Sequence, residues 1–426
     1  MAKANNTLSA DAAPWAPSKG WWSAALIGAA CALLAIERLA ADRLSNSTAY
    51  LIGKALLARE NGHLQSFNFD YPPLPMLLVL AWPDERWVAL LVGGCHAFLM
   101  VLVLYECVRL GLSRWTLALV MLGTYLLPSA LGAGEDLPSM LAMVVLFSAS
   151  GSFRRFINEG LTHDAFQCGL RLALAGCATP VGVGLGIALA VAHLVVGQRQ
   201  SGRVGPEVVP SSGAKWAAVL VLLFPLSILL GCWFYLSWLE TGNAALRFMP
   251  ETVAAGGGWS LLPYAICLLA IWPPSQRLAV NTAVTCMAAI ILAAQLLLLQ
   301  DGRSAPGASV GPTDAVALSR TERMVGQRLA GAKAGSILLD ARQTLRPIAM
   351  AGTARPFLAE GDARFSLALL DPASQTSHVL VDSAAPADSA LAAYADKPPP
   401  GMTLEASFGT YRLYRRPDAV ALLGSF

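Results

Sequence analysis

The sequence predicts a polytopic α-helical membrane protein that carries a small α/β domain at its C-terminus. Hydrophobic residues make up 55% of the chain and charged residues only 13%, whereas an ordinary soluble domain carries about 25% charged residues. The mean hydropathy is +0.55, and the apolar residues fall in long runs of the length that crosses a bilayer, about 20 residues. After residue 300 these runs give way to short strand-like and helix-like patterns.

We expect about nine membrane spans within residues 1–300. The apolar stretch 166–197 is too long for one span and is interrupted by Gly176, Pro180 and Gly182, so it predicts two short segments that meet at a break. Counting that stretch twice, the expected spans lie at 20–40, 86–108, 115–133, 137–151, 166–197, 216–238, 259–273 and 278–299. No cleavage site follows the first run in the required form, which favours a retained helix.

The distribution of Lys and Arg in the short loops predicts the orientation, because these residues accumulate on the cytoplasmic side. Lys19, Arg109, Arg154, Arg155 and Arg277 then fall inside with the N-terminus. An odd number of spans places the C-terminal domain on the opposite side of the membrane. We therefore expect a bacterial inner-membrane protein with a cytoplasmic N-terminus and a periplasmic C-terminal domain.

A Gly/Pro/Ser-rich linker at 301–312 separates the transmembrane domain from a soluble domain at 313–426. Apolar residues at helical spacing predict an amphipathic helix over 314–333, which would lie on the membrane or against a partner. Further helices are expected at 354–360 and 387–395. Short apolar runs predict strands at 336–340, 347–350, 378–382, 403–406 and 411–414. This pattern is typical of a small α/β unit.

Charge and cysteine content exclude several classes of function. The net charge is only +3, so no surface field would attract nucleic acid. All eight cysteines lie in or beside the apolar runs before residue 300, which argues against a disulfide framework or a zinc site. The C-terminal domain lacks a Gly-rich phosphate loop and a nucleophile elbow, so we do not expect it to be an enzyme by itself.

The segment Asp70-Tyr-Pro-Pro-Leu-Pro-Met-Leu-Leu opens a short apolar run after a polar loop that contains Asp42 and Tyr50. A first membrane helix, an outer loop with an acidic residue and a helix, and then a Tyr-Pro-Pro-Leu step into the membrane resemble the GT-C-fold glycosyltransferases. The protein O-mannosyltransferase and aminoarabinose transferase families belong to this group. The broken Gly-rich stretch 170–192 and the soluble tail are similar to further parts of those enzymes.

The resemblance implies a GT-C-like fold and transfer of a sugar from a polyprenyl-phosphate donor at the outer face of the membrane. Such transfer requires a base that activates the acceptor and cations that stabilise the leaving phosphate. Asp42 and Asp70 are the candidate catalytic carboxylates. The candidate substrate-binding residues are Tyr71, the acidic pair Glu135 and Asp136, and the cations Arg43, Lys54, Arg59 and Arg247. The cofactor stays open, and a bound divalent metal is one candidate.

The same residues also admit structural interpretations. Asp70 and Tyr71-Pro72-Pro73 fit the first turn of a helix, Asp42 fits a solvated charge outside a span, and Glu135-Asp136 fits the positive end of a helix. His96 within a span is either functional or a packed, hydrogen-bonded residue. Glu106 and Arg109, three residues apart, predict an ion pair on a helix surface.

Two departures from the family pattern support an alternative function. The stretch 45–50 reads Ser-Asn-Ser-Thr-Ala-Tyr where the families carry an acidic pair, and Ala178-Thr179-Pro180 lacks the family's lysine. The alternative is a non-catalytic GT-C-like subunit that binds protein partners in a larger membrane complex. A transporter is the third hypothesis, and only the broken segment 166–197 supports it.

Overall fold

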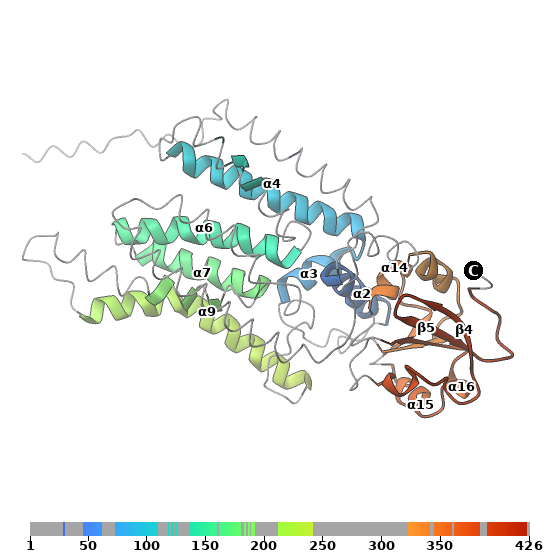
Figure 1. Ribbon diagram of the computed structural model, residues 1–426. Coiled ribbons are helices and arrows are strands. Elements are labelled where there is room, and N and C mark those ends of the chain that lie inside the picture. The colour runs from blue at the N-terminus through green and yellow to red at the C-terminus, as the bar shows by residue number, and fades with distance from the viewer. Residues whose placement is uncertain are drawn as a thin grey trace, which may run out of the picture.

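The computed structural model describes the chain in nine stretches and a few isolated positions. These stretches are 46–61, 73–109, 137–159, 162–179, 212–241, 323–340, 345–359, 362–383 and 390–423, with isolated positions at 29 and between 118 and 191. Helices form the first five stretches, and a five-stranded sheet with short helices forms the remainder (Figure 1). The structure is thus mostly helical, with a small sheet domain at the C-terminal end, as the sequence predicts.

Three helices among the described residues are long and apolar enough to cross a membrane. These segments run from Glu85 to Cys107, from Leu137 to Phe156 and from Trp216 to Leu239, and they coincide with predicted spans at 86–108, 137–151 and 216–238. The predicted spans at 20–40, 259–273 and 278–299 lie outside the described residues, as does nearly all of the span at 115–133. The linker 301–312 lies outside them too.

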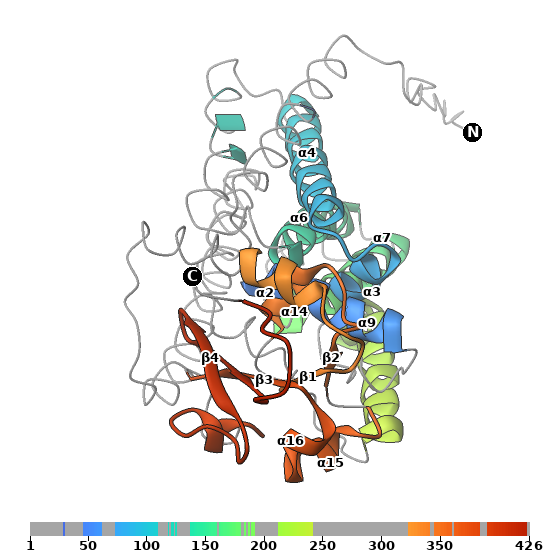
Figure 2. The ribbon, with the colours of Figure 1, turned by 90° about the vertical axis from the view of Figure 1, so that its right-hand side faces the viewer.

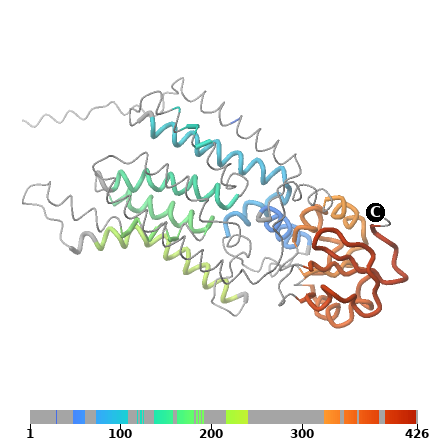
Figure 3. Tube along the Cα trace, in the orientation of Figure 1, coloured from blue at the N-terminus to red at the C-terminus, as the bar shows by residue number. Residues whose placement is uncertain are grey.

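Four helices of the bundle lie side by side in the order α4 (Glu85–Arg109), α6 (Leu137–Glu159), α7 (Thr162–Ala178) and α9 (Ser212–Thr241) (Figures 1 and 3). Helix α7 ends at Ala178, directly before Thr179-Pro180, where the sequence predicts a break. Proline disfavours the helical conformation of the residue before it, which explains this end.

Helices α7 and α9 approach each other closely at Gly169. A Cβ atom on Gly169 would lie 2.2 Å from the carbonyl oxygen of Leu222 and 3.1 Å from Cδ of Pro225. Pro225 lies inside α9 and removes one hydrogen bond of that helix. Gly169 therefore permits a contact between the two backbones that no other residue type would permit.

Two ion pairs mark the two ends of α4. At its beginning, Glu85 Oε2 accepts a hydrogen bond of 2.9 Å from Arg323 of the C-terminal region. Near its end, Glu106 pairs with the buried Arg154 of α6, so its partner comes from a second helix; the Arg109 side chain lies outside the described residues. Glu85 and Glu106 are 21 residues apart, and at 1.5 Å per residue this separation is about 32 Å along the helix. The hydrocarbon core of a bilayer has a similar thickness, about 30 Å.

The sheet has the strand order β2-β1-β3-β5-β4. Its strands are β1 (Ile337–Leu339), β2 (Phe357–Leu358), β3 (His378–Asp382), β4 (Thr403–Phe408) and β5 (Tyr411–Arg415). Strand β1 pairs in parallel with β2 and β3, and β5 pairs antiparallel with β3 and β4. The strands predicted at 336–340, 378–382, 403–406 and 411–414 are confirmed.

Two predictions for this domain are wrong, and they are neighbours in the chain. The segment 347–350, predicted as a strand, lies in helix α14 (Arg346–Ala351). Pro347 fits the first helical turn, and Gly352 ends the helix in the left-handed conformation with φ +67°. The segment 354–360, predicted as a helix, instead contains β2. At 387–395 the described part holds only a short 3₁₀ turn, η4 (Ala392–Tyr394).

Helices cover both faces of the sheet because two successive connections run in opposite directions along it. The first passes from β1 through α14 to β2, and the second returns past β1 through α15 (Phe365–Leu370) and α16 (Pro372–Gln375) to β3. Right-handed connections then place α14 on one face and α15 on the other (Figure 2). Ile337 and Leu339 accordingly pack in one apolar cluster with α14, and Leu338 packs in another with Phe365 of α15.

The face that carries α14 is continuous with the core of the helical bundle. One cluster of buried side chains includes Leu146 of α6, Leu51 of helix α2 (Asn46–Asn61), Ile348 of α14 and Leu380 of β3. The helix at 323–330 contributes Val325 and Leu329 to the same cluster. This part of the predicted amphipathic helix 314–333 is therefore helical, and its apolar side packs against protein.

Candidate functional site

Helix α2 and the short helix α3 (Pro73–Ala81) lie between the helical bundle and the sheet domain (Figures 1 and 2). Helix α2 is the helix that the sequence leads us to expect in the first loop after the N-terminal apolar run. Every side chain from Thr48 to Leu57 is buried. Helix α3 begins at the second proline of the Tyr-Pro-Pro-Leu segment, where the fixed φ of proline suits the first turn.

The contact between α2 and the sheet domain is made at Gly53. A Cβ atom on Gly53 would lie 2.8 Å from the carbonyl oxygen of Leu345 and 2.9 Å from its Cβ. Leu345 directly precedes α14, so the absence of a side chain on Gly53 allows α14 to rest on α2. This close approach sets the position of the sheet domain on the bundle.

Glu60, at the end of α2, fixes the same contact through hydrogen bonds. Its Oε2 atom accepts a bond of 2.9 Å from Thr353 Oγ1 and bonds of 2.7 Å and 2.8 Å from the backbone N–H groups of Ala354 and Arg355. Hydrogen bonds to a carboxylate are shorter and stronger than those between neutral groups. One carboxylate thus binds the turn that follows α14.

Two of the predicted substrate-binding cations, Lys54 and Arg59, lie on α2, and the structure does not bring them to one surface. Lys54 is 3% exposed, and its Nζ atom lies 5.7 Å from the centre of the Tyr50 ring, within the range of a cation–π interaction. Arg59 is exposed. Five residues of an α-helix amount to about 500° of rotation, or about 140° beyond a full turn, so the two side chains leave different sides of α2.

The other predicted site residues lie outside the described residues. These are the catalytic candidates Asp42 and Asp70 and the substrate-binding candidates Arg43, Tyr71, Glu135, Asp136 and Arg247. Asp42 precedes α2 by four residues and Asp70 precedes α3 by three. Within the stretches that the structure describes, no group of three or more His, Cys, Asp or Glu side chains is arranged to hold a metal ion.

His96, the histidine within the predicted span of α4, is 7% exposed. Its Nε2 atom lies 3.3 Å from the carbonyl oxygen of Thr124. Its ring stacks on that of Tyr125, with 5.8 Å between the ring centres. The interpretation of His96 as a packed, hydrogen-bonded residue is therefore confirmed.

A second polar cluster, which the sequence does not single out, lies at one end of the sheet and joins His378, Glu405 and Arg415. His378 and Arg415 are paired across β3 and β5, and Glu405 stands at an irregularity of β4. His378 Nε2 lies 3.3 Å from Glu405 Oε2, and both side chains are buried. Arg415 Nε lies 3.9 Å from the same carboxylate oxygen.

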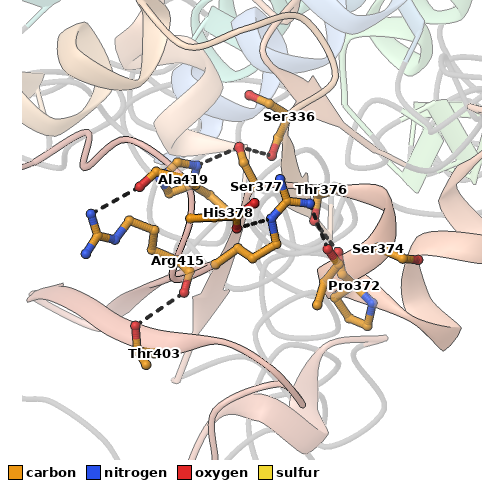
Figure 4. Close-up of polar contacts among 12 residues, drawn as sticks. Ser336, Pro372, Ser374, Thr376, Ser377, His378, Thr403, Arg415 and Ala419 are labelled. Carbon is orange, nitrogen blue, oxygen red and sulfur yellow. Dashed lines mark hydrogen bonds and ion pairs between the residues drawn. The ribbon is translucent and has the colours of Figure 1, made fainter.

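Ser377 completes the cluster on the other side of the imidazole (Figure 4). Its Oγ lies 2.8 Å from His378 Nδ1 and donates to the carbonyl oxygen of Ser336 at 3.1 Å. Burial of the imidazole lowers the pKa of His378, whereas Glu405 raises this pKa. The nearby Arg415 lowers the pKa further. We assign a net lowering, because a buried imidazole loses the hydration that favours its charged form.

The cluster also holds the last described residues of the chain. Glu405 Oε1 accepts a hydrogen bond of 2.7 Å from the backbone N–H of Leu423, and Arg328 donates to the Leu423 carbonyl. Arg415 Nη1 donates to the Ala419 carbonyl at 3.2 Å (Figure 4). Glu405, Arg415 and Arg328 therefore hold the C-terminal segment over the sheet. A histidine and a glutamate that open or interrupt apolar strands are the only sequence signal for this cluster.

No protein-family model, curated protein or solved structure matches this chain.

Proposed function

We propose that this protein is an integral membrane glycosyltransferase that takes a sugar from a polyprenyl-phosphate donor. Support for membrane insertion comes from the three long apolar helices. The spacing of about 32 Å between the charged pairs at Glu85 and Glu106 is also consistent with a bilayer. In this proposal the bundle spans the inner membrane about nine times, and the sheet domain lies in the periplasm.

The observation that carries the proposal is the position of α2 and α3 beneath the sheet domain. Asp42 and Asp70 flank these two helices in the sequence, four residues before α2 and three residues before α3. Helices α2 and α3 pack on each other, so both carboxylates directly precede helices of one packed unit. This arrangement supports a site at the junction between the bundle and the sheet domain.

In the proposed reaction, a carboxylate of Asp42 or Asp70 accepts the proton of an acceptor hydroxyl. The hydroxyl oxygen attacks the anomeric carbon, the bond from this carbon to the phosphate oxygen breaks, and polyprenyl phosphate leaves. Cationic side chains stabilise the charge that develops on the phosphate. Of the two described cations on α2, the exposed Arg59 is the one that a phosphate can reach from solvent.

Transfer of radiolabelled sugar from polyprenyl phosphate to cell-envelope acceptors, measured with the purified full-length protein, tests the proposal. We expect Asp42→Asn or Asp70→Asn to lower the rate at least about a hundredfold, the usual contribution of a general base. The control is Asp418→Asn, because Asp418 is exposed and its ion pair is with the nearby Arg416. Transfer that is unchanged in both Asn variants would contradict the site.

A second candidate function is a non-catalytic subunit of a larger membrane complex. Lys54 is buried beside Tyr50, and Glu60 binds the turn after α14. Two of the charged side chains on α2 therefore take part in packing. This function predicts a stoichiometric protein partner that purifies with the chain and no sugar transfer by the purified protein.

A further inference from the structure

Two arginines from neighbouring helices converge on one serine hydroxyl at the end of the bundle that is remote from the sheet domain. Arg155 Nη2 of α6 donates to Ser152 Oγ at 3.0 Å, and Arg171 Nη1 of α7 donates to the same oxygen. Their neighbour Arg154 pairs with Glu106, about 32 Å along α4 from the Glu85 contact with the C-terminal region. From this geometry we infer that Arg155 and Arg171, which the buried Ser152 holds together, bind the phosphate of an anionic phospholipid.

The cluster carries one positive charge that no carboxylate of the described chain neutralises. Arg154 is paired with Glu106, and Arg155 Nε lies 3.2 Å from Asp164 Oδ1. Arg171 donates to two neutral acceptors instead, the carbonyl oxygen of Ser148 at 2.9 Å and the Ser152 hydroxyl. A guanidinium has five N–H donors, so both arginines keep donors for an additional acceptor. An anion would neutralise the remaining charge.

Both arginines are partly exposed. The side chain of Arg155 is 31% exposed, and Arg171 is half-buried. A partly desolvated pair of arginines binds phosphate well, because the planar guanidinium matches phosphate oxygens with two parallel hydrogen bonds. The charge and the geometry together select a phosphate group.

The surface beside Arg171 favours a lipid over a free phosphate ion. Phe166, Leu170 and Leu174 follow one another at four-residue spacing along α7 and are 41%, 51% and 45% exposed. Residues at this spacing form one stripe on a helix, and Arg171 lies next to Leu170. A phospholipid would cover this apolar stripe with an acyl chain while its phosphate contacts the arginines. Inorganic phosphate would make no contact with the stripe.

This inference rests on the proposed membrane insertion and is independent of sugar transfer. The orientation that the sequence predicts places the α6–α7 turn on the cytoplasmic side, so the ligand would come from the inner leaflet. Anionic headgroups of that leaflet attract Lys and Arg residues near the membrane surface. The proposed transfer site lies at the opposite end of the bundle.

Native mass spectrometry of the full-length protein in neutral detergent tests the inference. The probes are phosphatidylglycerol, phosphatidylcholine of the same chain length and inorganic phosphate. We expect phosphatidylglycerol to bind the wild-type protein at least about tenfold more tightly than phosphatidylcholine. Arg171→Gln should weaken phosphatidylglycerol binding about tenfold, the effect of losing one charge-assisted contact. Arg171→Lys keeps the positive charge, so it should retain part of the affinity for phosphatidylglycerol. This result would show that the site tolerates substitution at position 171.

Arg416→Gln is the matched control, because Arg416 is a partly exposed arginine of the sheet domain and its loss should not change lipid binding. Equal binding of phosphatidylglycerol to wild-type protein and Arg171→Gln would overturn the inference. Equal binding of the two lipids, or displacement of phosphatidylglycerol by millimolar inorganic phosphate, would also overturn it. Because the measurement requires no sugar donor, failure of lipid binding and failure of transfer are separate results.

Discussion

Glu60 connects two parts of the chain that are 293 residues apart. Its carboxylate accepts one hydroxyl and two backbone N–H groups from the turn after α14. Glu60 has no sequence feature that distinguishes it from a solvated charge at the end of a helix. Its packing contact is with the turn at 353–355, which lies close to Glu60 only in the folded chain. The residues next to Glu60 in the sequence therefore do not predict this contact.

Replacement of Glu60 should loosen the sheet domain. We expect Glu60→Gln to lower the free energy of unfolding by about 1 to 2 kcal/mol, because a neutral amide loses the charge-assisted part of these hydrogen bonds. Thermal unfolding of the purified protein in detergent, followed by tryptophan fluorescence, measures the change. Arg59→Gln is the control, since Arg59 is the exposed neighbour on the same helix. Equal unfolding midpoints for Glu60→Gln and the wild type would show that these bonds contribute nothing.

The polar residues with local signals are the ones that sequence reasoning places correctly. His96 within an apolar run admits a functional or a packed interpretation, and the contact with Thr124 agrees with the packed one. Lys54 and Arg59 look equivalent in the sequence, yet one is buried over Tyr50 and the other is exposed. Lys54 lies within the stretch 48–57 of α2, in which every side chain is buried, whereas Arg59 lies beyond that stretch. The residues of α2 do not predict where this burial ends.

At the scale of elements, apolar runs predict the buried strands and the long helices because each has a clear length and period. Strands β1 and β3 are short apolar runs buried in the middle of the sheet, as parallel strands are. The error at 347–360 arises where the signal is weakest. Strand β2 has only two residues, and α14 has six, so neither covers enough turns or alternations to show a period.

Gly169 allows a close contact between α7 and α9. We expect Gly169→Ala to destabilise the protein by about 1 to 3 kcal/mol, because the added Cβ overlaps the Leu222 carbonyl and forces α7 and α9 apart. Gly231→Ala is the matched control in α9, where a Cβ meets no atom within 4 Å and alanine favours a helix more than glycine does. Unfolding midpoints of the two variants, compared in one detergent, measure the difference. A Gly169→Ala variant as stable as Gly231→Ala would refute the close contact.

At the scale of the whole molecule, the charges near the two ends of α4 lie about 32 Å apart along the helix. The sheet domain contacts the Glu85 end through Arg323, and the α6–α7 turn lies at the Glu106 end through Arg154. The sequence predicts that α4 crosses the membrane, so its two ends would face opposite compartments. Three of the predicted spans coincide with long apolar helices among the described residues.

Labelling of cysteines introduced one at a time tests this topology, with the unsubstituted background as the control for native cysteines. Asp418→Cys in the sheet domain and His163→Cys beside the α6–α7 turn place a thiol at exposed positions. A membrane-impermeant maleimide applied to intact spheroplasts should label the cysteine at 418 and not the one at 163. Both should react once the membrane is permeabilised. A background with Cys232→Ser removes an exposed native cysteine. Labelling of both positions in intact spheroplasts would contradict the arrangement.

The packing of α2 against α14 constrains how the protein is made. The ribosome completes α2 at Asn61, and α14 begins 285 residues later, at Arg346. At about 5 to 20 residues per second, synthesis of this interval takes about 14 to 57 s. During that time the apolar side of α2 that later meets α14 has no permanent neighbour. The contact between α2 and α14 therefore forms only after the C-terminal region has been synthesised.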